Sequence, residues 1–308
     1  MVMTEAVSRS LERVQVLGVP VDVLDRDGII GWMTQALADP WDGHCRHVVT
    51  LNPEYVMAAR RDLEFNQAIE RADLVVADGV GVAVAGRLLS GRPGQPARMT
   101  GVDLTEWLAG AGEHLFLVGA APSVAARARE ALVRCFPTAR IAGVWTDGAP
   151  RSSDDDATLG AIQGSGARAV LVAYGAPGQV TWIARNRTAL AAGGVRMAIG
   201  IGGTFDYLAG TVPRAPHWMQ RLGLEWLYRL AREPRRWRRQ LALPRFAGLV
   251  WIGWLWRRGN RGRRLVKTMA PAKQRPEPTS PPASAPPQTI QTPSISDERS
   301  PTYEPKPS

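Results

Sequence analysis

The chain contains 308 residues, with 38 lysines and arginines against 28 aspartates and glutamates, so its formal net charge is +10. Hydrophobic residues make up 45% of the chain, which is enough for a sizeable core in one large domain or two small ones. The two cysteines, Cys45 and Cys135, form no C-x-x-C pattern. This argues against a disulfide framework and against a cysteine-based zinc site.

Neither end of the chain has the pattern of a membrane-targeting segment. Residues 1–17 are polar and charged without an apolar stretch, so we expect no signal peptide. Residues 271–308 contain 11 of the 24 prolines and few strongly apolar side chains, which predicts a disordered tail. The longest apolar run, residues 246–256, is about half of the roughly 20 residues that a membrane-spanning helix needs. We expect a cytoplasmic protein that acts in solution or at a membrane surface.

Short apolar segments alternate with longer amphipathic segments between residues 15 and 205. The expected strands cover a pair within 15–23 and then 47–50, 73–77, 114–118, 140–145, 169–174 and 197–201. The expected helices cover 28–38, 53–72, 80–89, 103–110, 123–135 (with Ser123 as N-cap), 154–163 and 179–191. Such alternation is typical of βαβ units. We therefore predict an α/β fold, with a mainly parallel, Rossmann-like sheet and helices on both faces.

The pattern divides the chain into three parts. Residues 1–212 form the predicted α/β core, residues 213–269 a basic, tryptophan-rich helical appendage, and residues 270–308 the proline-rich tail. From Arg214 to Lys267 there are 15 basic and two acidic residues, a net charge of +13, together with six of the 11 tryptophans. The rest of the chain has a net charge of −3, so the positive charge is concentrated in the appendage.

Three interpretations of the appendage remain open. Its arginines form a solvated face over buried tryptophans, or they bind an anionic membrane surface, or they bind nucleic acid. Arginine mixed with tryptophan suits the headgroup region of an anionic leaflet. The apolar run 246–256 needs an apolar partner rather than a phosphate backbone. We therefore expect a membrane surface as partner and no nucleic acid.

Four expected strands end in small or polar residues that a core would not favour. These ends are Thr50–Asn52, Asp78–Gly81, Gly175–Gln179 and Gly200–Asp206. The carboxyl ends of parallel strands are where such sheets bind ligands, and glycine lets the backbone approach a phosphate closely. Ordinary turn geometry explains any one of these loops equally well. No strand is followed by an intact dinucleotide-binding glycine motif or a P-loop lysine, which argues against a nucleotide-cofactor oxidoreductase.

Two groups of acids are candidates for chemistry. Asp78 follows a buried strand, where desolvation raises the pKa of a carboxyl group and suits it as a base. The alternative is an Asp-Gly turn that caps the next helix. Asp154–Asp156 resembles the metal-binding acids of some sugar transferases, but the start of an expected helix favours acids on its own account. None of the four histidines has metal-ligand spacing, so we expect no metal site.

Seven segments, in order, resemble the WecG/TagA/CpsF family of bacterial glycosyltransferases over residues 15–243. They are Thr50–Glu54, Ala72–Gly81, Arg98–Leu104, Gly175–Gln179, Gly200–Asp206, Arg214–Pro216 and Leu224–Leu230. The resemblance implies inverting, metal-free transfer of a sugar from a UDP-sugar to a polyprenyl-diphosphate-linked saccharide. It places this reaction at the inner face of the cell membrane, in cell-surface polysaccharide synthesis, with no cofactor. It also implies a homo-oligomer.

The resemblance also implies a role for each matching residue. Asp78 is expected to be the general base for the acceptor hydroxyl, and its expected active-site companions are Thr50, Asn52, Arg98 and Gln179. The expected nucleotide contacts are Gly200, Gly202, Gly203 and Asp206. The expected cations at the diphosphate are Arg229, Arg236 and Arg239.

One departure from the family pattern concerns the donor sugar. The family usually has Lys-Gln-Glu after Gly-Ala-Pro, whereas this chain has Gly178-Gln179-Val180. The donors that the resemblance offers are N-acetylmannosamine, its uronic acid, glucose and glucuronic acid. The alternative function is a non-catalytic, membrane-recruited scaffold on a degenerate transferase fold. A scaffold predicts loss of the base or of the arginines, and the sequence retains both.

Overall fold

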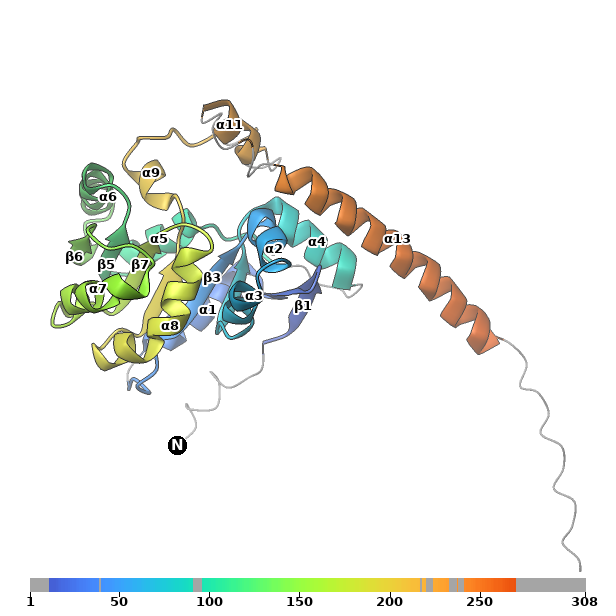
Figure 1. Cartoon of the computed structure of the whole chain (residues 1–308), viewed down its shortest axis with the longest axis horizontal. Helices are drawn as coiled ribbons and strands as arrows, with labels where there is room; N and C mark the ends of the chain where they lie inside the picture. The colour runs from blue at the N-terminus through green and yellow to red at the C-terminus, as the bar shows by residue number, and fades with distance from the viewer. Residues whose placement is uncertain are drawn as a thin grey trace, which may run out of the picture. The chain divides into compact units, whose positions relative to one another are not determined.

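The computed structural model describes residues 11–38, 40–90, 96–216, 218–219, 224–232, 237 and 241–269, without the side chains of Arg229 and residues 259–269. Its central feature is a six-stranded, fully parallel sheet in the order β4-β3-β8-β7-β5-β6 (Figure 1). The strands are β3 (Arg46–Leu51), β4 (Leu74–Ala77), β5 (His114–Gly119), β6 (Arg140–Trp145), β7 (Ala169–Ala173) and β8 (Met197–Gly200). The predicted strands of the core are confirmed.

Helices cover both faces of this sheet, which confirms the predicted fold class. One face packs against α1 (Arg26–Leu37), α5 (Gly101–Gly110), α6 (Pro122–Cys135) and α9 (Thr204–Leu208). The other packs against α2 (Pro53–Ala59), α3 (Leu63–Glu70), α4 (Val80–Ser90), α7 (Asp155–Ile162, after the 3-10 turn Ser152–Asp154) and α8 (Gly178–Ala192). Consecutive strand residues such as Val48 and Val49 point to opposite faces, so both faces of the sheet are apolar and need a cover.

The N-terminal strand pair is the hairpin β1 (Arg13–Val16) and β2 (Val19–Asp22). Its two-residue turn, Leu17-Gly18, has positive φ angles of 54° and 88°, the geometry that tight hairpins favour. The buried carboxylate of Asp22 accepts from Arg13 Nε at 2.8 Å and from the backbone N–H of Val75 at 2.7 Å. These bonds attach the hairpin to β4.

Two details of the predicted helices were wrong. The helix expected over 53–72 is two helices, because Asp62 accepts from the N–H of Phe65 and starts α3. Helix α6 begins at Pro122 with Ala121 as N-cap, so Ser123 is not the cap. Proline suits the first helical position because its fixed φ and missing N–H cost nothing there.

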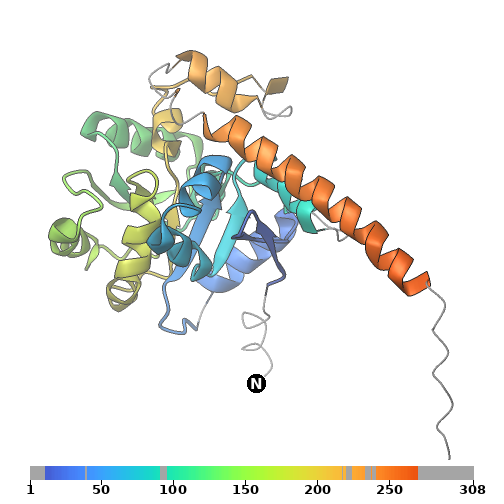
Figure 2. The same cartoon turned by 45° about the vertical axis from the view of Figure 1, so that its right-hand side comes forward.

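The region of the predicted appendage contributes helices α11 (Glu225–Arg232) and α13 (Ala242–Met269). Phe246 and Val250 of α13 are buried in the same hydrophobic cluster as the hairpin and α2–α4, and Figure 2 shows α13 beside α4. Residues 1–264 form one compact unit. The apolar run 246–256 is therefore partly core rather than wholly an external surface.

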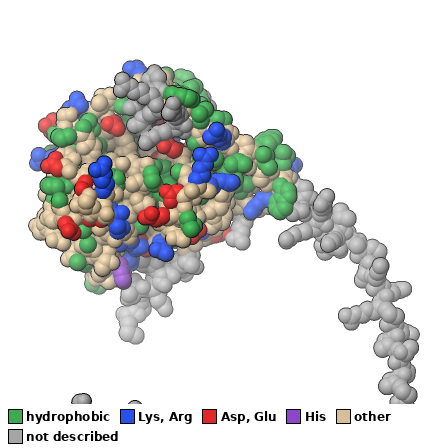
Figure 3. All heavy atoms as spheres, in the orientation of Figure 1, with side chains coloured by type: hydrophobic (Ala, Val, Ile, Leu, Met, Phe, Trp, Pro, Cys, Tyr) green, Lys and Arg blue, Asp and Glu red, His purple; other side chains and the backbone are tan. Residues whose placement is uncertain are grey.

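The opposite side of α13 exposes large apolar side chains, as Figure 3 shows. They are Trp251, Ile252, Leu255 and Trp256. Among the described residues, no helix is long and apolar enough to span a membrane. The division between the α/β core and the appendage at residues 212/213 stays a prediction. The predicted proline-rich tail, residues 270–308, lies outside the described part of the chain.

Candidate active site

The four strand ends singled out in the sequence belong to four neighbouring strands. Thr50 and Asn52 end β3, Asp78 follows β4, the segment Gly175–Gln179 follows β7, and the glycine-rich segment from Gly200 ends β8. In the sheet these strands lie in the continuous order β4-β3-β8-β7. Because all four are parallel, their carboxyl ends meet at one edge and bring the predicted residues together.

Asp78 lies between β4 and α4, and its backbone N–H donates to the carbonyl of Leu51 at 2.8 Å. Desolvation, together with the negative charge of Glu225, raises the pKa of its carboxyl group to about 7. The nearby guanidinium of Arg98 acts in the opposite direction. A carboxyl group with a pKa near neutrality can both accept and return a proton at physiological pH.

A network of ion pairs surrounds Asp78 and joins α11 to the core. Arg98, which pairs with β4 through the bridge to Ala77, donates to Glu225 Oε2 at 2.8 Å. Glu225 Oε1 lies 3.7 Å from Arg214 Nε, and Arg214 Nη2 lies 3.6 Å from Asp103 Oδ1. Two arginines thus converge on one carboxylate beside the candidate base.

Three members of this network were missed as site residues: Asp103, Arg214 and Glu225. The available signal was their position inside the segments Arg98–Leu104, Arg214–Pro216 and Leu224–Leu230 that carry the family resemblance. A sequence pattern does not reveal that residues so far apart along the chain form one cluster.

Gln179 is fully buried and connects two loops of the site with helix α2. Its Oε1 accepts from the N–H groups of Gly175 and Gly202 at 3.1 and 3.0 Å, and its Nε2 donates to the Tyr55 hydroxyl at 2.7 Å. A Cβ on Gly200 would lie 2.7 Å from Gln179 Nε2, so only glycine fits there. Through these hydrogen bonds Gln179 holds the surrounding segments of the site in fixed positions.

Thr50 and Asn52 are held by the same framework. The Thr50 hydroxyl donates to the carbonyl of Gly200 at 2.7 Å and joins the ends of β3 and β8. The Asn52 side chain accepts from the N–H of Tyr55 at 2.9 Å and caps α2. Local capping and a cross-strand bond therefore fix both side chains at the edge of the sheet.

The glycine-rich segment after β8 turns directly into α9. Gly202 has φ of +56° and Gly203 is the N-cap of the helix, which contains Asp206 in its first turn. The backbone carbonyl of Asp206 accepts from the N–H of Thr211 at 3.0 Å. The predicted nucleotide contacts thus form one continuous turn beside Gln179.

The structure does not describe the side chains of the three arginines that were predicted to bind the diphosphate. Arg229 lies in α11, but its side chain is outside the described residues, as are Arg236 and Arg239 entirely. Their role at the diphosphate stays a prediction.

The acids Asp154–Asp156 start α7, as the helix-start interpretation predicts. Asp154 accepts from the N–H of Ala149 at 3.0 Å, and Asp155 binds Arg185 at 2.7 and 2.9 Å. Partial desolvation raises the pKa of Asp155, but hydrogen bonds from Arg185, Asn186 and Trp182 and the charge of Arg185 together hold it below its ordinary value. Within the described ranges, no three His, Cys, Asp or Glu side chains are grouped as metal ligands.

His47 is buried, and burial together with Arg187 lowers the pKa of its ring to about 3. It is a neutral core residue. The His114 ring contacts Arg140 at 3.1 Å at the far end of β5 and β6, away from the strand ends that carry the site.

Comparison with known proteins identifies the family that this chain matches. The model of the glycosyl transferase WecG/TagA/CpsF family matches residues 14–260. Two similar proteins are each named N-acetylglucosaminyldiphosphoundecaprenol N-acetyl-beta-D-mannosaminyltransferase. The protein of Bacillus spizizenii strain W23 is 35% identical over 207 residues, 66% of this chain and 77% of the relative. The protein of Bacillus subtilis strain 168 is 35% identical over 206 residues, 65% of this chain and 77% of the relative.

The family match spans every element that contributes to the site, from β3 to α11. The cluster at the carboxyl edge of the sheet places Asp78, a carboxyl group of near-neutral pKa, beside two arginines, an arrangement that suits a group-transfer reaction. The chain therefore belongs to the WecG/TagA/CpsF family of glycosyl transferases and is a glycosyltransferase.

Proposed function

We propose that the chain transfers a sugar of the N-acetylmannosamine type, by inversion, from a UDP-sugar to a polyprenyl-diphosphate-linked saccharide. The names of the two Bacillus relatives support both the sugar and the lipid-linked acceptor. Glucose and glucuronic acid are the alternative donor sugars, because the segment after Gly175-Ala-Pro177 departs from the family pattern. The product belongs to cell-surface or extracellular polysaccharide synthesis.

The observation that carries this proposal is the environment of Asp78. Its ionised carboxylate takes the proton of the acceptor hydroxyl as that oxygen attacks the anomeric carbon of the donor. The bond between the sugar and UDP breaks, and UDP leaves with the electron pair. With a pKa of about 7, the carboxylate is basic enough to accept the proton and is still ionised in a large fraction of the molecules at neutral pH.

Arginines supply the charge that the departing diphosphate requires. Arg98 and Arg214 lie close enough to Asp78 to lower its pKa. Guanidinium groups bind phosphate oxygens through paired hydrogen bonds, so they stabilise the developing negative charge. We propose that Arg229, Arg236 and Arg239 complete this set when substrate is bound.

A lipid-linked acceptor places the reaction at a membrane. We propose that the basic region 213–269 holds the enzyme at an anionic inner-membrane surface as a peripheral protein. Its net charge of +13 from Arg214 to Lys267 and the exposed tryptophans of α13 support this location. Self-association of the chain is proposed from the family resemblance alone.

The Asp78→Asn substitution tests the proposed base. Asparagine keeps the shape of the side chain but cannot accept the proton, so we expect turnover about 10²–10⁴-fold below wild type with UDP binding retained. Near wild-type turnover of the purified variant would show that Asp78 is not the base.

Thermal unfolding provides the control for this variant. The folded state raises the pKa of Asp78 from 3.8 to about 7, so the stability that Asp78 contributes at acid pH is lost as pH rises to 7. Asparagine does not ionise, and the variant should therefore be at least as stable as wild type above pH 7. If the variant is less stable than wild type above pH 7, its lost turnover would be attributed to a folding defect rather than to loss of the base.

A further inference from the structure

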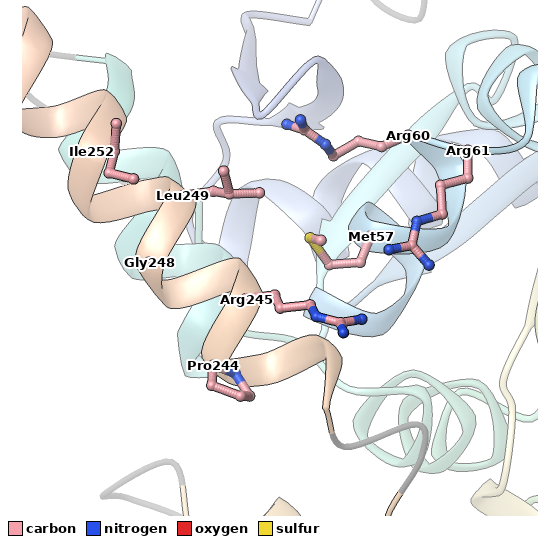
Figure 4. Close-up of a pocket in the computed structure, with 8 residues that line it drawn as sticks. All are labelled: Met57, Arg60, Arg61, Pro244, Arg245, Gly248, Leu249 and Ile252. Atoms are coloured by element: carbon pink, nitrogen blue, oxygen red, sulfur yellow. The ribbon is translucent and has the colours of Figure 1, made fainter.

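A groove separate from the active site lies between α2 and α13. Its volume is about 510 Å³, and Figure 4 shows side chains from both helices around it. Arg60 and Arg61 line it from the C-terminal end of α2, and Arg245 lines it from α13. Met57 and Leu249 are among its apolar lining residues, and no acidic residue lines it.

The arginines of this groove are available for an anion. Arg61 and Arg245 are exposed, and in the described part of the chain neither forms an ion pair with a carboxylate. Arg60 donates to the carbonyl of Leu17 at 3.4 Å. In Figure 4 the side chains of Arg61 and Arg245 extend into the same space beside Met57. Two guanidinium groups that line one groove free of acidic residues can bind an anion such as phosphate through paired hydrogen bonds.

The rest of the groove continues as an apolar stripe along α13. Arg245, Leu249, Ile252 and Trp256 are spaced by four, three and four residues, so they lie along one side of the helix. Ile252 is 62% exposed and Trp256 is 71% exposed, whereas Phe246 on the adjacent side is buried in the core. One end of the stripe is cationic and the other apolar, which matches a ligand with an anionic head and a hydrocarbon chain.

We infer that this groove binds an anionic phospholipid of the bilayer. Its phosphate lies between Arg61 and Arg245, and its acyl chain lies along Leu249, Ile252 and Trp256. The inference rests on the proposed membrane-surface location and adds to it a discrete lipid site built by the α/β core and α13 together. General attraction of the basic region to a charged surface needs no such groove.

The lipid-linked acceptor is the other ligand that combines phosphate with a hydrocarbon chain, and the kinetic measurement described below distinguishes it from a phospholipid. The diphosphate of the acceptor is attached directly to the reacting saccharide, so it stays within a short saccharide's length of Asp78. Arg60 and Arg61 lie at the far end of α2 from Asn52, about 10 Å along a seven-residue helix.

Vesicle binding of two charge-matched double variants tests the inference. Full-length R61Q/R245Q and the control R129Q/R134Q each lose two exposed arginines, the control pair from α6. Sedimentation uses vesicles of phosphatidylcholine with and without phosphatidylglycerol. Because each basic residue near an anionic surface contributes about fivefold to binding, we expect the loss of two to make R61Q/R245Q bind phosphatidylglycerol vesicles about 30-fold more weakly than wild type. The control should bind as wild type does.

The possible outcomes separate this inference from the proposed function. Equal weakening of vesicle binding in both variants would show that only net charge matters. Wild-type binding by R61Q/R245Q would show that the groove binds no lipid. Either result overturns the inference and leaves the proposed function intact. An increased KM of R61Q/R245Q for lipid-linked acceptor in detergent, with unchanged vesicle binding, would also overturn it and assign the groove to the acceptor. If wild type fails to bind anionic vesicles at all, the proposed membrane location fails with it. Thermal unfolding of both variants confirms that each is folded.

Discussion

At the scale of single residues, the chemistry of the site depends on contacts between distant parts of the chain. The pKa of Asp78 is raised first by its burial at the end of β4, which the sequence pattern predicts, and then by Glu225 of α11, which it does not. Glu225 also binds Arg98, so one side chain of α11 influences both the proposed base and a cation near it.

The pH dependence of kcat/KM tests this arrangement. The base must be ionised, so we expect kcat/KM to rise with pH and to level off above about 7. Glu225→Gln removes a negative charge that raises the pKa of Asp78 and releases Arg98, which lowers it. Both effects move the rise to lower pH. The exposed Glu130→Gln on α6 is the control and should keep the wild-type profile. An unchanged rise in Glu225→Gln would contradict the role given to Glu225.

Residue roles could be predicted only as far as local pattern reaches. The residues at the strand ends were identified because polar and glycine residues there interrupt apolar strands. The bracing contacts of Gln179 with Tyr55, Gly175 and Gly202 depend on how α2, β7 and β8 pack together. No spacing along the chain encodes that packing.

At the scale of elements, the strands were predictable because buried parallel strands are apolar throughout. The break between α2 and α3 was missed because apolar residues continue at helical spacing across it. The run 246–256 was identified, but which side of it faces the core was not. Apolar residues occur all around that part of the helix, so their pattern does not distinguish buried Phe246 and Val250 from exposed Trp256.

Unfolding experiments test the packing of α13. Phe246→Ala removes a buried ring and should lower the free energy of unfolding by about 3–5 kcal/mol. Trp256→Ala removes a larger but exposed ring and should change it by less than about 0.5 kcal/mol. Urea denaturation followed by circular dichroism measures both. Equal, small effects would mean that α13 does not pack on the core.

At the scale of the whole molecule, the most basic part of the sequence also contributes residues to the candidate site. The region with a net charge of +13 includes Arg214 and Glu225 of the site network and the exposed side of α13. An acceptor that is both anionic and lipid-linked suits such a combination. The rest of the chain, by contrast, is slightly acidic and contains the glycine-rich loops that we propose contact the nucleotide.

Chelation tests whether arginines serve in place of a metal. Asp154 and Asp155 are already bound by the Ala149 N–H and by Arg185, so neither is poised as a ligand. We expect turnover to persist after exhaustive treatment with EDTA. A strict requirement for added Mn²⁺ or Mg²⁺ would contradict the metal-free reaction and would favour Asp154–Asp156 as metal ligands.

Glycosyl transfer itself is tested most directly by the mass of the lipid product. The purified full-length protein is incubated with N-acetylglucosaminyl-diphospho-polyprenol and, one at a time, the UDP derivatives of N-acetylmannosamine, its uronic acid, glucose and glucuronic acid. We predict that UDP-N-acetylmannosamine adds one N-acetylhexosamine to the acceptor and releases UDP. Release of UDP with no change in the mass of the lipid, or no reaction with any of the four donors, would contradict the proposed function.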